Sequence, residues 1–170
     1  LVATEERVYG VSKNEGAAGV GFLFELFLNG TFNKVHFFDG ADGAGVTALA
    51  RGSSDSLFGA SFSGGGKAGG DIFSFDVHSQ SFKVMHRLGS PNSSFPIDLV
   101  AGVGGQLYGI YTLPQRTVFA FDVDSGRFAL VYAGEGLTAK LLVSQGESSL
   151  LLVTPFTYVT DCGSISKLSW

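Results

Sequence analysis

The chain has 170 residues, of which 45% are hydrophobic and 15% charged, a composition that favours a folded core over disorder. Its net charge is −4 and its 11 lysines and arginines are scattered, so we expect no nucleic-acid partner, because phosphate binding needs a basic surface. The longest apolar runs fall far short of the ~20 residues that a membrane-spanning helix needs, so we expect no transmembrane segment.

The rest of the composition favours short strands. The chain contains 16 Phe and 25 Gly but only 4 Pro, a balance typical of β-strands joined by tight turns. Cys162 is the single cysteine, which excludes a disulfide within the chain and a cysteine-rich zinc site.

In chain order, one succession of residues appears three times, beginning with VYG at 8–10, LFG at 57–59 and LYG at 107–109. The aromatic residue of each triplet recurs after 49 and then 50 residues. A second series of phenylalanines, later in each copy, is spaced by 49 and 46 residues: Phe24, Phe73 and Phe119. A nearly fixed period of this size indicates a repeat array.

Each copy resolves into four short strands separated by Gly, Asp, Ser or Pro. Within TVFAFDV of the third copy, residues alternate so that Phe119 and Phe121 share one face and Val118 and Ala120 the other. Four antiparallel strands in ~45–50 residues match one blade of a β-propeller. The strands predicted in the third copy are 97–103, 106–112, 117–123 and 127–133.

We therefore predict an all-β fold, a β-propeller-like array of four-stranded antiparallel blades with about three and three-quarter blades present. Residues 1–170 form a single propeller domain or a propeller fragment. Because the chain begins at Leu1 and ends within a blade, we expect a piece of a larger propeller rather than a small closed ring. The predicted blades cover about 1–38, 46–88, 97–133 and 139–170, the last incomplete.

Three glycines fall inside predicted strands: Gly10, Gly59 and Gly109. Glycine weakens a strand, so its presence there usually marks a close neighbour. We expect the aromatic side chains of an adjacent blade to pack over these positions.

The order of motifs suggests relatives. The succession L-[YF]-G-x-x, a Gly-rich loop, G-x-[LIV]-F-x-[LF], a further G-x-F segment and x-G-x-D-G-A resembles the tandem repeats of secreted bacterial proteins called choice-of-anchor GloVer-repeat proteins. The matching pieces within 7–136 are VYGVSKNEGAAGVGFLFELFLNGTFNKVHFFDGADGA, LFGASFSGGGKAGGDIFSFDVHSQSFKVMHRLGS and LYGIYTLPQRTVFAFDVDSGRFALVYAGEG. The chain departs from the pattern at TLPQR and GSPNSSFP.

This resemblance implies propeller-like repeats on exported, surface-associated proteins. It implies a secreted or cell-surface location for the chain, although the sequence as given begins without a signal peptide. It carries over no catalytic residues.

Two features suggest metal ligands at first. His36 and His86 are one repeat period apart, so they occupy equivalent outer strands of different blades, too far apart to share an ion. Asp39 and Asp42 in DGADGAG could face calcium, but the further ligands of an EF-hand are missing, and a turn between blades is favoured. We predict no metal site.

Motifs for catalysis are likewise incomplete. GGGKAGG at 64–70 lacks the first glycine and the Ser or Thr of a phosphate-binding loop. SFDVHSQSF and AFDVDSGRF resemble a turn of quinoprotein propellers, but the expected tryptophan is absent, so Asp76 and Asp122 are interpreted as turn caps. No G-x-S-x-G elbow is present. We predict no catalytic residue and no cofactor, and an enzyme is the less favoured class.

Two functions stay open. The favoured one is a non-catalytic extracellular or cell-surface scaffold that binds a carbohydrate, a protein or a small ligand. The alternative is a fragment of a propeller enzyme, such as a quinoprotein-like or kelch-like oxidoreductase, with its active residues elsewhere. Open blade edges also predict self-association. The loop residues predicted to contact a ligand are Lys13, Asn14, Asp42, Lys67, Asn92 and Arg116.

Overall fold

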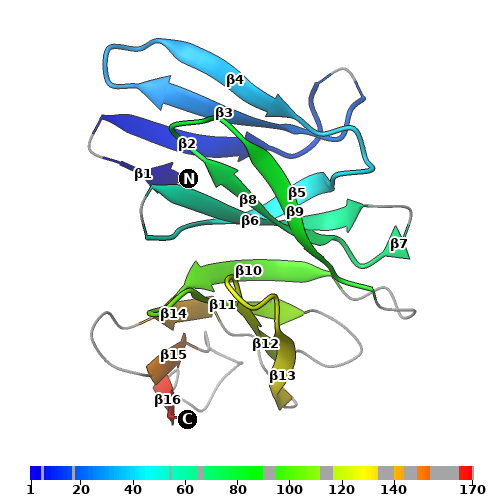
Figure 1. Ribbon diagram of the computed structural model, residues 1–170, viewed down its shortest axis with the longest axis vertical. Coiled ribbons are helices and arrows are strands. Elements are labelled where there is room, and N and C mark those ends of the chain that lie inside the picture. The colour runs from blue at the N-terminus through cyan, green and yellow to red at the C-terminus, as the bar shows by residue number, and fades with distance from the viewer. Residues whose placement is uncertain are drawn as a thin grey trace, which may run out of the picture.

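The computed structural model consists of β-strands arranged in successive antiparallel sheets (Figure 1). Within the described residues, no helix is long and apolar enough to span a membrane. The structure describes residues 1–4, 6–16, 18–53, 55–64, 67–89, 95–111, 117–133, 140–143, 149–153 and 165–169.

The described strands form four sheets, numbered here in chain order. Sheet 1 contains β1 (Val2–Ala3), β2 (Arg7–Ser12), β3 (Phe22–Phe27) and β4 (Phe32–Phe37). Sheet 2 contains β5 (Ala44–Arg51), β6 (Ser56–Gly64), β8 (Asp71–Asp76) and β9 (Phe82–Arg87), with β7 (Lys67–Ala68) paired to β6.

Sheet 3 contains β10 (Pro96–Ala101), β11 (Gln106–Tyr111), β12 (Thr117–Asp122) and β13 (Phe128–Ala133). Sheet 4 contains β14 (Lys140–Val143), β15 (Ser149–Val153) and β16 (Ile165–Ser169). In each sheet the main strands are ordered as in the sequence. The prediction of an all-β fold is confirmed. Three sheets have four main strands each, and sheet 4 has three strands among the described residues.

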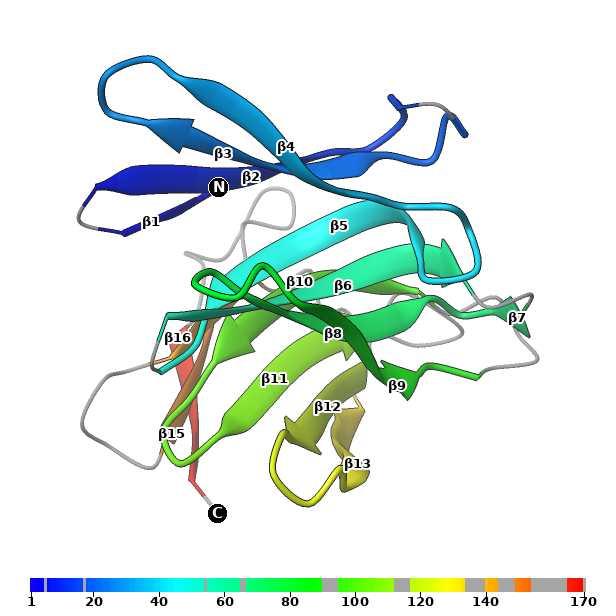
Figure 2. The same cartoon turned by 45° about the horizontal axis from the view of Figure 1, so that its top comes forward.

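The sheets are stacked face to face, with sheet 2 between sheets 1 and 3 (Figure 2). The alternation predicted for the third copy is confirmed, because Phe119 and Phe121 are both 0% exposed and pack into the layer between sheets 2 and 3. Phe73 and Phe75 take the corresponding places between sheets 1 and 2. Burying one such side chain contributes roughly 1.5–3 kcal/mol to stability, so these aromatic layers join the sheets.

The expectation for the strand glycines was wrong in one respect. Each glycine is indeed covered by a phenylalanine ring, but the ring comes from the next strand of the same sheet. Gly59 lies opposite Phe73 in the register of β6 and β8, and a Cβ at Gly59 would collide with the Cζ atom of that ring. The flat ring needs the empty space, which is why glycine recurs there. The same pairs occur in sheets 1 and 3: Gly10 with Phe24, and Gly109 with Phe119.

The two histidines of the repeat lie at different sheet junctions. The His36 ring of sheet 1 is stacked on Phe82 of sheet 2, with centroids 3.8 Å apart and planes 3° apart. The His86 ring of sheet 2 is stacked on Phe128 of sheet 3 at 4.8 Å and 8°. Burial lowers the pKa of His86 below its usual value. Each histidine therefore packs one sheet on the next.

The turn role predicted for two aspartates is confirmed. Oδ1 of Asp76 accepts hydrogen bonds from the amides of His78 and Ser79, and Oδ1 of Asp122 accepts one from the amide of Ser125. These bonds, above all that from the Ser79 amide, hold the pKa of Asp76 below its usual value, and the Ser125 amide does the same for Asp122. Both carboxylates fix tight turns.

Candidate ligand-binding site

A cavity of about 360 Å³ opens where the β2–β3 connection of sheet 1 meets β5 and β6 of sheet 2. Strands β2, β4 and β6 all end on this side of the array, on the right of Figure 1. The amide of Gly45 donates to the Val20 carbonyl at 2.9 Å and ties the two sheets together beside it. The cavity is lined by Lys13, Asn14, Gly19, Val20, Ala44, Gly45, Phe62 and Ser63.

Phe62 provides an aromatic wall of the cavity. Its side chain is 39% exposed, and its ring packs on Phe95 with centroids 3.9 Å apart. The ammonium of Lys13 lies 5.7 Å from the centroid of Phe62, a cation–π distance. An exposed ring held by a second ring and flanked by a cation presents a rigid surface to a ligand.

Gly45 leaves the space that forms the cavity. A methyl group at Gly45 would lie 3.5 Å from Cβ of Phe62 and 3.7 Å from Cε of Lys13. The strand registers place Gly45 of sheet 2 at the position of Phe95 of sheet 3. Between sheets 2 and 3 this position therefore carries Phe95, which covers Phe62. Between sheets 1 and 2 it carries Gly45, which has no side chain.

Of the predicted contact residues, Lys13 and Asn14 lie together on the cavity wall, and both are exposed. Lys67 lies in β7, where it pairs with Gly64, and its side chain is outside the described part of the structure. Asn92 and Arg116 lie outside the described residues. Whether any of these residues binds a ligand stays a prediction.

Asp42 lies in the β4–β5 turn and contacts the sheet junction. Its Oδ2 is 2.7 Å from Nε2 of His36, and its Oδ1 accepts the amide of Asp39 at 3.0 Å. Oδ1 of Asp39 accepts the amides of Ala41 and Asp42, and the Ala41 bond is the main cause of a lowered pKa of Asp39. These carboxylates hold the turn, and no group of three His, Cys, Asp or Glu suited to a metal occurs among the described residues.

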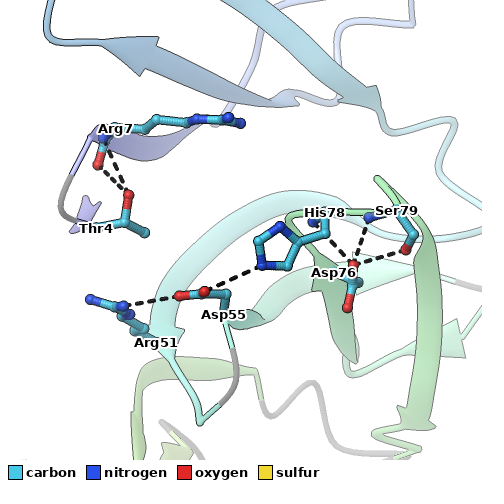
Figure 3. A network of polar contacts seen from close by, with 7 residues as sticks. All are labelled: Thr4, Arg7, Arg51, Asp55, Asp76, His78 and Ser79. Atoms are coloured by element: carbon cyan, nitrogen blue, oxygen red, sulfur yellow. Dashed lines mark hydrogen bonds and ion pairs between the residues drawn. The ribbon is translucent and has the colours of Figure 1, made fainter.

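A second cleft, of about 310 Å³, lies between sheets 1 and 2 at their opposite end (Figure 3). Arg51 donates to Oδ1 of Asp55 at 3.0 Å and to the carbonyl of Ala3 at 3.2 Å, and His78 contacts Oδ2 of Asp55 at 3.3 Å. Arg7 donates to the buried Glu25 at 3.1 Å. The cationic side chains of this cleft, Arg7, Arg51 and His78, already contact carboxylates. These polar contacts join the two sheets, so the cleft is a less suitable binding site than the first cavity.

Comparison with solved structures identifies the fold. The chain superposes on TolB from Acinetobacter baumannii with a TM-score of 0.61 at 14% identity, covering 96% of this chain and 38% of that one. It superposes on the PQQ-bound aldose sugar dehydrogenase from Streptomyces coelicolor with a TM-score of 0.62 at 14% identity, covering 87% and 52%. The fold is that of a β-propeller.

A putative TolB from Agrobacterium tumefaciens matches with a TM-score of 0.59 at 12% identity, covering 90% of this chain and 54% of that one. The chain thus spans about half or less of the length of these propeller structures. No protein-family model and no curated protein matches its sequence. At these identities the comparisons define the propeller fold alone.

Among the described residues, Asp71 is a buried carboxylate near the loop end that the sequence analysis missed. Asp71 is 0% exposed, and neither of its carboxylate oxygens accepts a hydrogen bond from the described residues. Among the described side chains the nearest cation is that of Arg87, whose Nη1 lies 3.8 Å from Oδ2. Burial raises the pKa of Asp71 above its usual value. In sheet 1 the corresponding pair is aromatic, Phe22 opposite Phe37.

Phe62 and Phe95 were also missed as site residues. The predicted contact residues are polar and lie in loops, whereas both phenylalanines stand near or next to strand ends. The available signal was an aromatic residue directly before a glycine-rich loop, in SFSGGG.

Proposed function

We propose that this chain is a non-catalytic part of a β-propeller that binds a ligand in the loop-end cavity between sheets 1 and 2. The observation that carries the proposal is the exposed ring of Phe62, braced by Phe95 and flanked by Lys13. Ligand sites combine apolar walls with a few polar groups that fix orientation, and here Lys13 and Asn14 supply donors.

A carbohydrate fits this arrangement best. The C–H face of a sugar ring packs on an aromatic side chain, while its hydroxyls accept hydrogen bonds from ammonium and amide groups. The cavity volume of about 360 Å³ is in the range of sites for one small ligand. No carboxylate lies on the cavity wall among the described residues, and Lys13 is its one ionisable side chain there.

The binding test starts with an array of neutral and acidic oligosaccharides and continues with calorimetry on the best sugar. Phe62→Ala should weaken binding about tenfold and Lys13→Ala by a smaller factor, because each removes one contact with the sugar. Leu130→Ala is the matched control, since Leu130 is exposed but lies on β13, away from the cavity.

Equal affinity of Phe62→Ala and the unchanged protein would remove the cavity from consideration. If Phe62→Ala does weaken binding, Lys67→Ala and Arg116→Ala test how far the site extends along the loops. Undiminished affinity in both variants would mean that the site is confined to the cavity between sheets 1 and 2. It would refute the prediction that Lys67 and Arg116 contact the ligand.

A second candidate is a segment of a propeller enzyme, because one matched structure is a PQQ-bound aldose sugar dehydrogenase. Adding PQQ to the protein and following the absorbance of the quinone would detect such a site. The repeat resemblance also supports an exported or cell-surface location, which fractionation of the native cells tests.

A further inference from the structure

A further cavity, of about 450 Å³, lies between sheets 2 and 3 beside the turn that joins β10 to β11. Sheet 2 contributes Arg51 and Phe58 to its wall, whereas sheet 3 contributes residues 101–107 and Val123. Because three of the seven residues in that range are glycines, we call this cavity the glycine cleft. None of the residues that line it lines the loop-end cavity, so the two are separate places on the molecule.

The glycine cleft is the counterpart, one sheet further along the array, of the cleft between sheets 1 and 2 in Figure 3. Strand register shows this, because Leu57 and Leu107 begin the equivalent LFG and LYG triplets. Leu57 pairs with Arg51 of β5, and Leu107 pairs with Ala101 of β10. Ala101 of sheet 3 therefore takes the place that Arg51 takes in sheet 2.

The turns that follow these two strands correspond in the same way. The amide of Val77 donates to the carbonyl of Asp55 at 3.4 Å, and the amide of Val123 donates to the carbonyl of Gly105 at 3.0 Å. Asp55 and Gly105 also share a left-handed backbone conformation, with φ of 57° and 75°. Gly105 therefore takes the place of Asp55.

In the cleft of Figure 3, a guanidinium group joins the two sheets. Arg51 donates to the carbonyl of Ala3 in sheet 1 at 3.2 Å and to Oδ1 of Asp55 at 3.0 Å. Ala3 pairs with Val8, the first residue of the VYG triplet, so it has the register position in sheet 1 that Arg51 has in sheet 2. The guanidinium is thus held by a carbonyl of the preceding sheet and by a carboxylate at the β5–β6 turn.

The glycine cleft has both kinds of acceptor, but sheet 3 supplies no guanidinium to them. By register, the carbonyl of Arg51 takes the place of the Ala3 carbonyl, and Ala101 offers it only a methyl group. The carboxylate is that of Asp124, an exposed residue whose Oδ2 would lie 3.2 Å from a Cβ atom at Gly105. A carboxylate therefore stands beside the position from which Asp55 contacts its arginine in the preceding sheet.

We propose that the glycine cleft binds the guanidinium group of an arginine side chain of a peptide or protein partner. The guanidinium donates to the Asp124 carboxylate and to the Arg51 carbonyl, as Arg51 itself does to the corresponding acceptors in the cleft of Figure 3. The ring of Phe58 in the wall and the side chain of Val103, which is 54% exposed, pack against the planar group and its methylene stem. The net charge of −4 favours a cationic partner.

The positive charge of Arg51 in the wall of the glycine cleft is compatible with a cationic ligand, because Asp55 lies 3.0 Å from it. The cleft of Figure 3 already holds two guanidinium groups, those of Arg7 and Arg51, and each contacts its own carboxylate, Glu25 or Asp55. The glycine cleft repeats this arrangement, with Asp124 as the carboxylate for the guanidinium of the ligand.

Titration with blocked amino acids, followed by nuclear magnetic resonance of the backbone amides, tests the proposal. Acetyl-arginine methylamide should shift the amide resonances of Gly104 and Gly105, with a dissociation constant in the millimolar range. Acetyl-citrulline methylamide has the same shape without the charge and should bind about tenfold more weakly. Acetyl-lysine methylamide should also bind more weakly, because an ammonium lacks the planar fork of donors.

Three variants locate the site. Asp124→Asn should weaken binding of the arginine compound about tenfold, whereas Glu15→Gln, which removes an exposed carboxylate from the β2–β3 connection, should not change it. Ala101→Arg places a guanidinium of the chain itself in the glycine cleft and should abolish binding. Phe62→Ala should leave arginine binding unchanged, which separates this site from the loop-end cavity.

Absence of shifts at Gly104 and Gly105, or equal binding of the arginine and citrulline compounds, would overturn the proposal. So would an Asp124→Asn variant that binds as strongly as the unchanged protein, or an Ala101→Arg variant that still binds. Asp124 is exposed, so its replacement leaves the fold intact, which circular dichroism verifies. The Asp124→Asn result therefore decides the question even if Ala101→Arg disturbs the packing of β10.

Discussion

At the scale of single residues, Asp71 is unusual, because packing alone would favour an apolar side chain at a fully buried position. Its carboxylate is fully buried and accepts no hydrogen bond from the described residues, and Nη1 of Arg87 lies 3.8 Å from its Oδ2. A buried group without hydrogen bonds costs about 1–3 kcal/mol, and the ion pair offsets part of that cost. The pKa of Asp71 is raised, so its ionised form is the destabilising one.

The sign of the pH effect follows from this shift. Since the folded pKa lies above the unfolded value of 3.8, the native state binds the proton more tightly, and the penalty grows as pH rises through the folded pKa. Asp71→Asn should therefore raise the free energy of unfolding by about 1 kcal/mol at pH 7, and this gain should vanish below pH 3.8. Urea denaturation at the two pH values measures it. A variant less stable at pH 7 would show that the carboxylate stabilises the fold.

At the scale of strands and sheets, the glycine–phenylalanine pairs predict a specific sensitivity. Gly59→Ala places a methyl group against the Phe73 ring, which is 0% exposed and cannot move without disturbing the layer between sheets. We expect a loss of about 2 kcal/mol in the free energy of unfolding. Gly89→Ala is the control, because no atom of the described residues, apart from its chain neighbours, lies within 4 Å of the added methyl group.

A second substitution separates this clash from a general effect of alanine on the strand. Phe73→Leu removes the part of the ring that meets the new methyl group. The double variant should therefore lose less than the sum of the two single losses, by a coupling energy of about 1 kcal/mol. Additive losses would show that ring overlap is not the cause.

The glycine–phenylalanine pairs also show which features of the fold could be predicted from the sequence and which could not. Repeat spacing and alternation predicted the strands, because turn residues and apolar periodicity are local signals. Spacing identifies equivalent residues but not which strand faces them, so the ring over Gly59 was assigned to a neighbouring blade instead of to the next strand. The Phe62–Phe95 pair joins sheets 2 and 3 across a junction, and local patterns carry no signal of such a contact.

At the scale of the whole molecule, an array of sheets is stabilised mainly by contacts between neighbours. Sheet 2 has a described sheet on each side, whereas sheet 1 has one on a single side. Amide hydrogens of β6 and β8 should therefore exchange slowly. Those of β3 should exchange faster, because opening of sheet 1 breaks one layer of described contacts instead of two.

Hydrogen exchange followed by mass spectrometry resolves the peptides of sheets 1 and 2 in one experiment. Equal protection of β3, β6 and β8 would show that packing between sheets does not limit the opening of their strands.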